Sequence, residues 1–217
     1  MERIAHAAER VGRGPGSVLL IGATKEVDAA RIRAAVAAGL HDFGENRIQE
    51  ALPKIAAVGE GARWHFIGHL QRNKARQAVG SFVTIHSVDS LKLAQAVDRA
   101  AGAAGRHVPV LIEVNMAGEP GKFGASPAAV PDLVGAVRGC THLEPAGLMT
   151  VAPFAHDPEV VRPIFRELRV LRDRLRSGSA GEDFRELSMG MSADFEVAIE
   201  EGATMVRIGR AIFGERT

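Results

Sequence analysis

Short apolar runs alternate with stretches of helical periodicity along the whole chain of 217 residues. Each run has the length and β-branched content of a buried strand, and each following stretch repeats apolar residues at intervals of three and four. This alternation predicts a parallel sheet covered by helices, because successive parallel strands need a helix-length crossover. The predicted strands are Val18–Ala23, Leu40–Phe43, Trp64–Ile67, Thr84–His86, Pro109–Val114, Ala146–Met149, Glu186–Ser188 and Met205–Ile208.

Eight repeats of this unit predict a closed (β/α)8 barrel of the TIM type, in the α/β class. An open, doubly wound sheet is the alternative that the same pattern allows. Ile4, Ala8 and Val11 share a helical face before the first strand, so we expect an additional N-terminal helix. No linker or change of composition divides the chain, and residues 1–217 are therefore expected to form a single barrel domain.

Capping residues indicate where three of the predicted helices begin or end. Gly39 closes the helix after the first strand, and Ser90 precedes another helix that starts at Leu91. Asp157 and Pro158 have the residue types typical of an N-cap and of the first helical position. These residues set the expected limits of the helices between the strands.

The composition is typical of a soluble globular protein, with 46% hydrophobic and 24% charged residues. The net charge of +1, with acids and bases mixed, gives no footprint for nucleic acid or an anionic membrane. No apolar run is long enough to cross a membrane, and no signal peptide is expected. With Cys140 as the one cysteine, we expect a reducing, cytoplasmic compartment. We also expect a monomer, because a complete barrel needs no partner to close its core.

Lys25 closely follows the first predicted strand. In a (β/α)8 barrel, active residues lie where the strands end and the loops begin. A lysine beside apolar walls can have a lowered pKa, which frees its amine to attack a carbonyl group and form a Schiff base. The alternative is an ordinary solvent-exposed charge at the end of a strand, and Lys25 alone does not decide between the two.

Two glycine-containing turns follow the last two predicted strands. Gly190 and Ser192 lie between the seventh strand and a helix, and Gly209 lies between the eighth strand and a last short helix. Such turns aim several backbone N–H groups at one point, and the Ser192 hydroxyl can join them in binding a phosphate group. A (β/α)8 barrel commonly binds phosphate after strands seven and eight. The alternative is that Ser192 only caps its helix and Gly209 only forms a turn.

Other polar residues collect near the ends of the remaining strands. Arg207, on the eighth strand, can either approach a bound cofactor or form an ion pair at the rim of the barrel. Three histidines, His65, His69 and His86, do not have the spacing of a zinc site, and no metal site is expected. The other candidates are Glu45, Asn46, Gln71, Asn115, Lys122, Met149 and Thr150.

Eight segments resemble, in the same order, motifs of the pyridoxal phosphate homeostasis protein family. They are ATKEV around Lys25, FGENRIQE, WHFIGHLQRNK, IHSVDS, VNMAGEPGKFG, GLMTVAP, LSMGMSADFEVAI and VRIGRAIFG, and together they span residues 18–214. The resemblance implies a barrel like the N-terminal domain of bacterial alanine racemases, with pyridoxal 5′-phosphate as cofactor. The positions that match the family's cofactor contacts are Lys25, Asn46, Met149, Ser192, Arg207, Gly209 and Arg210.

The resemblance also implies roles for these residues. Lys25 would hold the cofactor as a Schiff base. Ser192, Gly209 and the Arg210 backbone would bind the phosphate, and Arg207 would face the pyridine nitrogen. Asn46 and Met149 would lie near the cofactor ring. Family members are regarded as carriers or buffers of the cofactor inside the cell, without an established catalytic turnover.

The chain departs from the family's pattern at two positions. Thr24 stands before the lysine where family members often have serine, which is a mild change. Arg210 stands where a small residue such as threonine is expected. The phosphate would then be bound by the Arg210 backbone N–H with the side chain turned outward, or by the guanidinium itself through charge-assisted hydrogen bonds.

The residues favour a carrier over an enzyme. An arginine such as Arg207 at the pyridine nitrogen discourages protonation of that nitrogen and weakens the cofactor as an electron sink, although racemisation tolerates this arrangement. Racemisation needs a second acid–base group opposite Lys25, which a tyrosine of a second domain supplies in alanine racemases. The sequence contains no tyrosine and ends at Thr217 with no such domain, and nothing in it places His69 in that role.

Three functions therefore stand as hypotheses. The first is a pyridoxal phosphate carrier that holds the cofactor on Lys25 and supplies pyridoxal-phosphate-dependent apo-enzymes. The second is a minimal racemase or lyase that uses the same lysine. The third is an enzyme acting on a phosphorylated metabolite, in which Lys25 forms its Schiff base with the substrate.

Overall fold

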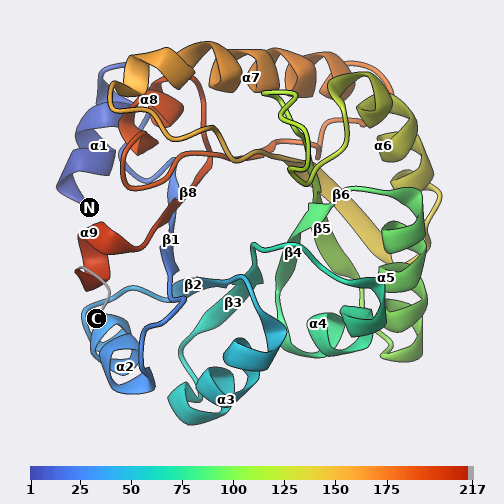
Figure 1. Ribbon diagram of the computed structural model, residues 1–217, viewed down its shortest axis with the longest axis horizontal. Helices are drawn as coiled ribbons and strands as arrows, with labels where there is room; N and C mark the ends of the chain where they lie inside the picture. The colour runs from blue at the N-terminus through green and yellow to red at the C-terminus, as the bar shows by residue number, and fades with distance from the viewer. Residues whose placement is uncertain (215–217) are drawn as a thin grey trace.

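Eight parallel strands form a closed barrel in the computed structural model, which describes residues 1–214 (Figure 1). Each strand pairs with the strands before and after it, and the eighth strand pairs with the first to close the cylinder. The prediction of a (β/α)8 barrel is confirmed, and the open-sheet alternative is wrong. The strands are β1 (Leu19–Ala23), β2 (Asp42–Glu45), β3 (Arg63–Phe66), β4 (Thr84–Val88), β5 (Val108–Glu113), β6 (Leu143–Met149), β7 (Glu186–Ser188) and β8 (Met205–Ile208).

Helices surround the barrel on its outside, and the expected N-terminal helix is present (Figure 1). This helix, α1 (Glu2–Glu9), lies beside α8 (Phe195–Glu200). The ion pairs between them include Arg3 to Glu196 at 2.9 Å and, from the residue that follows α1, Arg10 to Glu200 at 2.8 Å. Short 3₁₀ turns cover 72–74, 127–129 and 158–161. The helices are α1 (Glu2–Glu9), α2 (Ala29–Ala37), α3 (Ile48–Val58), α4 (Ala75–Ser81), α5 (Leu91–Ala103), α6 (Val130–Arg138), α7 (Arg162–Arg176), α8 (Phe195–Glu200) and α9 (Arg210–Phe213).

Six of the eight strands differ from their predicted ranges by one to three residues at a boundary, and two of these differences have a clear physical reason. The second strand begins at Asp42 and not at Leu40, because the Leu40 N–H donates to the Ala35 carbonyl and so closes α2. The sixth strand begins earlier than predicted and includes Pro145, a residue that usually interrupts a strand. A shift in the pairing of β5 with β6 accommodates this proline.

Some helix boundaries also differ from the prediction. Val11 lies beyond the end of α1 and is exposed, and Leu91 is exposed at the first position of α5. Ser192 does not cap the helix after β7, because α8 begins at Phe195 and its N-cap is Asp194. The Asp157 carboxylate accepts the Glu159 N–H at 2.9 Å, but it caps the 3₁₀ turn at 158–161, and α7 begins only at Arg162. The predicted role of Gly39 is confirmed: it follows α2 with a φ of 91°.

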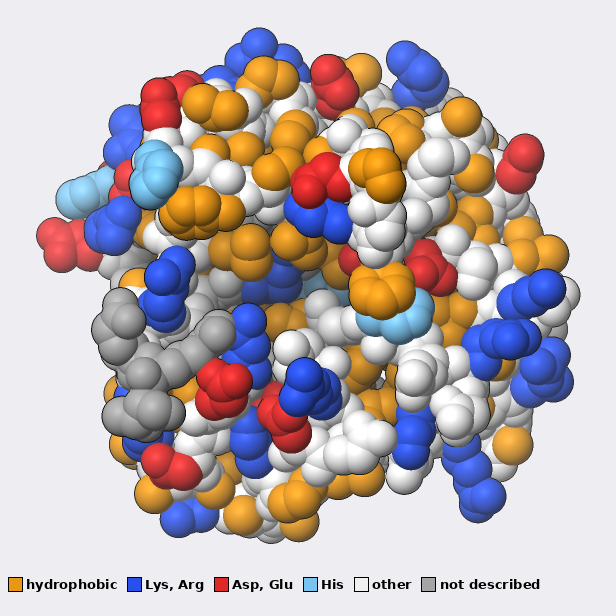
Figure 2. All heavy atoms as spheres, in the orientation of Figure 1, with side chains coloured by type: hydrophobic (Ala, Val, Ile, Leu, Met, Phe, Trp, Pro, Cys, Tyr) orange, Lys and Arg blue, Asp and Glu red, His pale blue; other side chains and the backbone are white. Residues whose placement is uncertain are grey.

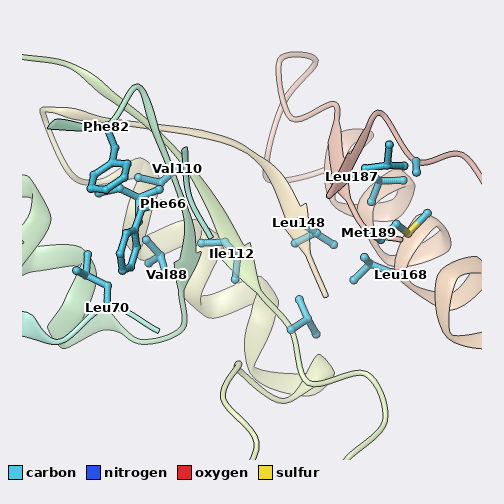
Figure 3. Close-up of a cluster of buried hydrophobic side chains, with 14 of the residues drawn as sticks. Phe66, Leu70, Phe82, Val88, Val110, Ile112, Leu148, Leu168, Leu187 and Met189 are labelled. Atoms are coloured by element: carbon cyan, nitrogen blue, oxygen red, sulfur yellow. The ribbon is translucent and has the colours of Figure 1, made fainter. Parts of the chain in front are cut away.

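The main hydrophobic core lies between the outer faces of the strands and the surrounding helices. Figure 3 shows part of it, with strand residues packed against neighbours such as Phe82 and Leu168. Packing of the helices against the outer faces of the strands therefore stabilises the barrel. Buried residues of this core include Phe66, Leu70, Val88, Val110, Ile112, Leu148, Leu187 and Met189.

The loop after β7 depends on Gly190. Its φ is 93°, in the region that favours glycine, and a Cβ added there would lie 2.6 Å from the Ala198 Cβ. We expect Gly190→Ala to lower the free energy of unfolding by about 2 kcal/mol or more, because it adds both backbone strain and overpacking. Urea denaturation followed by circular dichroism measures this change.

Gly80→Ala is the matched control. Gly80 lies in α4, has open space at its Cβ position and has no positive φ. Alanine in a helix should raise stability by about 0.5–1 kcal/mol. Equal effects of the two substitutions would contradict the steric role assigned to Gly190.

Candidate ligand site at the carboxyl ends of the strands

Lys25 lies in a tight turn at the end of β1. The Val27 N–H donates to the Thr24 carbonyl at 3.0 Å, and Glu26 has a φ of 62°, which is unusual for a residue other than glycine. Lys25 itself is exposed at the barrel mouth. Backbone strain of this kind concentrates at functional sites, where the surrounding structure holds it in place.

A cluster of polar side chains beneath this turn holds its backbone in place. The Lys54 ammonium, from α3, donates to the Thr24 carbonyl and to the Glu45 carboxylate, each at 2.7 Å. The Thr24 hydroxyl donates to the same carboxylate oxygen at 2.7 Å. The three side chains fix the backbone immediately before Lys25, and the sequence reasoning did not assign Lys54 to the site.

The two predicted glycine turns meet beside Lys25. β8 pairs with β1, and a Cβ on Gly209 would lie only 3.1 Å from the Ala23 carbonyl oxygen. The Arg207 N–H donates to the Gly190 carbonyl at 3.0 Å, so the loop that carries Ser192 starts beside β8. Lysine and both turns therefore lie at one corner of the barrel.

This corner has unused hydrogen-bond donors. Within residues 1–214, the backbone N–H groups of Ser192, Gly209 and Arg210 donate to no protein acceptor, and neither does the half-buried Ser192 hydroxyl. An anion such as phosphate is bound by backbone N–H groups and hydroxyls that have no acceptor within the protein. The Arg210 side chain is exposed, which agrees with the outward orientation considered from the sequence.

Arg207 is buried at the same end of the barrel, with 4% of its surface exposed. The guanidinium nitrogen Nη1 donates to the Ser188 carbonyl at 2.7 Å and to the Ser188 hydroxyl at 2.5 Å. The nitrogen Nη2 donates to the Thr150 carbonyl at 2.8 Å. Burial lowers the pKa of Arg207 to about 10, although Glu113 and Asp194 nearby oppose this shift. The guanidinium still carries its charge near neutral pH.

Glu113 is a site residue that the sequence reasoning missed. It ends β5, is buried, and its Oε2 atom has no hydrogen-bond partner among residues 1–214. Burial, followed by repulsion from Asp89, raises the pKa of Glu113 to about 7 against the attraction of Arg207. The signal was available in the sequence, because an acid ends the apolar run VPVLIE.

Asn46 and Met149 lie on either side of the mouth. Asn46 follows β2 and packs against Gly68, and its Oδ1 atom is buried without a partner in the described part of the chain. Met149 ends β6, is 1% exposed, and aligns in register with Glu113 and Ser188 of the neighbouring strands. An orphaned amide oxygen and a buried thioether are groups that a bound ring can contact.

The predicted histidines separate into two sets. His65 and His86 are buried inside the barrel and hydrogen-bond to each other at 3.2 Å. His69 lies at the rim, stacks on the exposed Phe123 with ring centroids 3.7 Å apart, and pairs with Asp89. No group of three or more His, Cys, Asp or Glu side chains in residues 1–214 is arranged to hold a metal ion.

Two grooves adjoin the mouth on the side of β2 to β4, with volumes of about 320 and 610 Å³. Both are lined by His69, Leu70 and Gln71, and the smaller one reaches Asn46. Figure 2 shows a hollow near the centre of the visible face, with Lys or Arg side chains inside it.

Every helix within residues 1–214 is too short or too polar to span a bilayer.

Comparisons with known proteins agree with this geometry. The family described as "Alanine racemase, N-terminal domain" matches residues 4–217. The pyridoxal phosphate homeostasis protein of Aquifex aeolicus (strain VF5) is 46% identical, over 100% of this chain and 95% of the relative. The Pseudomonas aeruginosa protein of that name is 43% identical, over 99% and 91%.

Solved structures of related proteins have the same barrel fold. PipY of Synechococcus elongatus PCC7942 with PLP bound is 39% identical, with a TM-score of 0.86 over 98% of this chain and 99% of that one. A diaminopimelate decarboxylase from Helicobacter pylori, 16% identical with a TM-score of 0.75, shares the fold. The class is thus that of the alanine racemase N-terminal barrels. Within it, the chain belongs to the pyridoxal phosphate homeostasis protein family.

The raised pKa of Glu113 predicts a pH-dependent stability. The folded state keeps this proton to about pH 7, whereas the unfolded chain loses it at its ordinary, lower pKa. Stability therefore falls as pH rises between the two values, by up to about 3 kcal/mol. Glu113→Gln should remove this fall, so the variant gains stability over wild type as pH rises toward 7. Urea denaturation of the ligand-free protein across that pH range measures it.

Glu144→Gln, an exposed position on β6, is the matched control for this experiment. Parallel pH profiles for wild type and Glu113→Gln would show that the Glu113 carboxyl is not held neutral by the fold.

Proposed function

We propose that this chain binds pyridoxal 5′-phosphate as a Schiff base on Lys25 and acts as a carrier or buffer of that cofactor in the cytoplasm. The observation that carries the proposal is the corner between β8 and β1. There Lys25 lies beside three backbone N–H groups and a hydroxyl that donate to no protein acceptor within residues 1–214. One corner thus offers an amine for an aldehyde and free donors for a phosphate.

The residues at the site fit the cofactor group by group. The N–H groups of Ser192, Gly209 and Arg210, with the Ser192 hydroxyl, would bind the phosphate oxygens. Arg207 has N–H groups beyond the three hydrogen bonds described above, and one of these would donate to the pyridine nitrogen. The orphaned Asn46 amide and the Met149 side chain would contact the ring.

Covalent attachment of the cofactor would need only the Lys25 amine and the release of one water molecule. Lys25 would hold the cofactor through a C=N bond between its amine nitrogen and the aldehyde carbon, and the aldehyde oxygen would leave as water with two protons from that nitrogen. When bound, the cofactor supplies an electron sink for carbanions formed next to its imine carbon.

Arg207 supports the carrier function over catalysis. Because a guanidinium donates hydrogen bonds and accepts none, it opposes protonation of the pyridine nitrogen and weakens the electron sink. The sequence has no tyrosine to act opposite Lys25, and His69 is held at the rim by Phe123 and Asp89. The named relatives are called homeostasis proteins.

The proposal includes a monomer that supplies pyridoxal-phosphate-dependent apo-enzymes. The barrel closes its sheet within one chain, so the site has all the groups named above without a second copy. The exposed position of Lys25 keeps the covalent bond within reach of solvent, and reversible release of the cofactor needs that access.

The first test is Lys25→Ala. Wild-type protein incubated with pyridoxal phosphate should absorb near about 420 nm, the usual region for a Schiff base of this cofactor, and the variant should lose the band. Borohydride reduction and peptide mass mapping should place the pyridoxyl adduct on Lys25 among the five lysines of the chain. Lys92→Ala is the control. An adduct on another lysine, or steady turnover of an amino acid by the loaded protein, would overturn the proposal.

The second test is Ser192→Ala. Loss of one hydroxyl hydrogen bond to a charged phosphate should raise the Kd for pyridoxal phosphate about tenfold to a hundredfold, measured by absorbance titration. Ser126→Ala, at an exposed serine without a side-chain cap bond, should leave the Kd unchanged. Equal Kd values for both variants would mean that the phosphate binds elsewhere.

A further inference from the structure

A continuous chain of hydrogen bonds runs through the interior of the barrel. Starting from Arg207, it passes to the Ser188 hydroxyl, to His86 at 3.0 Å, to His65 at 3.2 Å and to the Asp42 carboxylate at 3.0 Å. β4 and β7 are not neighbours in the sheet, so the bond between His86 and Ser188 crosses the interior. All five side chains are buried.

With Asp42 ionised and every buried donor satisfied, the donors in this series of hydrogen bonds can be assigned in only one direction. Arg207 is a donor only, so the Ser188 oxygen accepts from it. The hydroxyl proton of Ser188 then has the ring nitrogen Nδ1 of His86 as its acceptor. The Nε2–H of His86 therefore donates to His65.

The same logic continues to the far end. His65 accepts at Nδ1, so its Nε2–H donates to the Asp42 carboxylate, which also accepts from Arg63 at the barrel's opposite end. Burial would raise the pKa of Asp42, but the hydrogen bonds from His65 and Arg63 outweigh it and lower the pKa to about 2. Asp42 is thus an anion.

Both imidazoles are neutral in this assignment. Burial, with the positive charge of Arg207, places the pKa of His86 well below its usual range. A second proton on His86 would leave the Ser188 hydroxyl proton without an acceptor and would put a cation beside the guanidinium. Every buried donor is satisfied only when each ring carries its single proton on Nε2.

We propose that Ser188, His86, His65 and Asp42 are positioning residues that fix the Arg207 guanidinium, and thereby keep the pyridine nitrogen of the bound cofactor unprotonated. The inference rests on the proposed function. With its hydroxyl proton committed to His86, Ser188 presents only lone pairs to Arg207. The guanidinium cannot rotate without losing this bond and those to the Ser188 and Thr150 carbonyls. Its remaining N–H groups therefore keep one orientation.

The first experiment needs no cofactor. Long-range ¹H–¹⁵N correlation spectra of the ¹⁵N-histidine-labelled apo-protein report the tautomer of each ring. We expect His86 and His65, assigned by His→Gln variants, to be neutral with the proton on Nε2 near neutral pH. A proton on Nδ1 of His86, or a doubly protonated ring, would overturn the proposal whether or not the protein binds pyridoxal phosphate.

The second experiment compares Ser188→Ala with Ser87→Ala. Both serines are fully buried, but the Ser87 hydroxyl has no hydrogen-bond partner in the described chain, so Ser87→Ala is the matched control. Ser188→Ala should raise the Kd for pyridoxal phosphate about threefold to tenfold. It should also move the ¹⁵N shift of labelled cofactor's ring nitrogen toward its protonated value. Ser87→Ala should change neither quantity.

The outcomes separate the two proposals. If wild-type protein forms no Schiff base on Lys25, the proposed function fails. The tautomer measurement still tests the direction of the hydrogen bonds from Arg207 to Asp42. If wild-type protein binds the cofactor but Ser188→Ala matches Ser87→Ala in ring-nitrogen shift and Kd, the positioning role fails alone. Ser188→Thr retains a hydroxyl, so in a variant that folds, the wild-type ring-nitrogen shift should return, and its failure to return would count against the hydroxyl's role.

Discussion

Closure of the barrel between β8 and β1 is the constraint on which the site depends. It sets Gly209 against the Ala23 carbonyl and so brings the turn after the last strand beside Lys25, although the two are far apart in sequence. No local motif produces this proximity. The packing of helices against the outer wall stabilises the cylinder, and the cylinder then defines the distance between amine and anion corner.

The interior of the barrel differs from the layers of branched apolar side chains that usually fill this fold. Asp42, His65, His86, Ser188 and Arg207 occupy it, and burying such groups is costly unless each is hydrogen-bonded. The series of hydrogen bonds from Arg207 to Asp42 satisfies all of these groups. It places the two charged groups, Arg207 and Asp42, at its opposite ends. Replacing buried charged groups by well-packed apolar side chains is often neutral or stabilising, so stability alone does not account for this arrangement. An oriented guanidinium at the mouth does account for it.

The sequence predicted the barrel well because eight repeats of one pattern report the same topology independently. It predicted Lys25, Ser192 and Gly209 as candidates because they follow strands, and Arg207 because it lies near the end of one. In a barrel of parallel strands all the carboxyl ends lie at one rim. Contacts made across the interior, such as that between His86 and Ser188, were out of reach, since only the shear and radius of the closed cylinder decide which inward side chains meet. Lys54 was missed for a related reason, because it reaches the Thr24 turn from a helix.

The two departures from the family's pattern have different structural consequences. Thr24 places its hydroxyl on Glu45, a contact that serine can also make, so this change leaves the turn before Lys25 intact. Arg210 is exposed, and its backbone N–H is free within residues 1–214. The backbone donor of Arg210 can therefore serve the anion corner while the guanidinium lies outside it. A site built largely from backbone N–H groups tolerates such a change, because the donors do not depend on which side chain the residue carries.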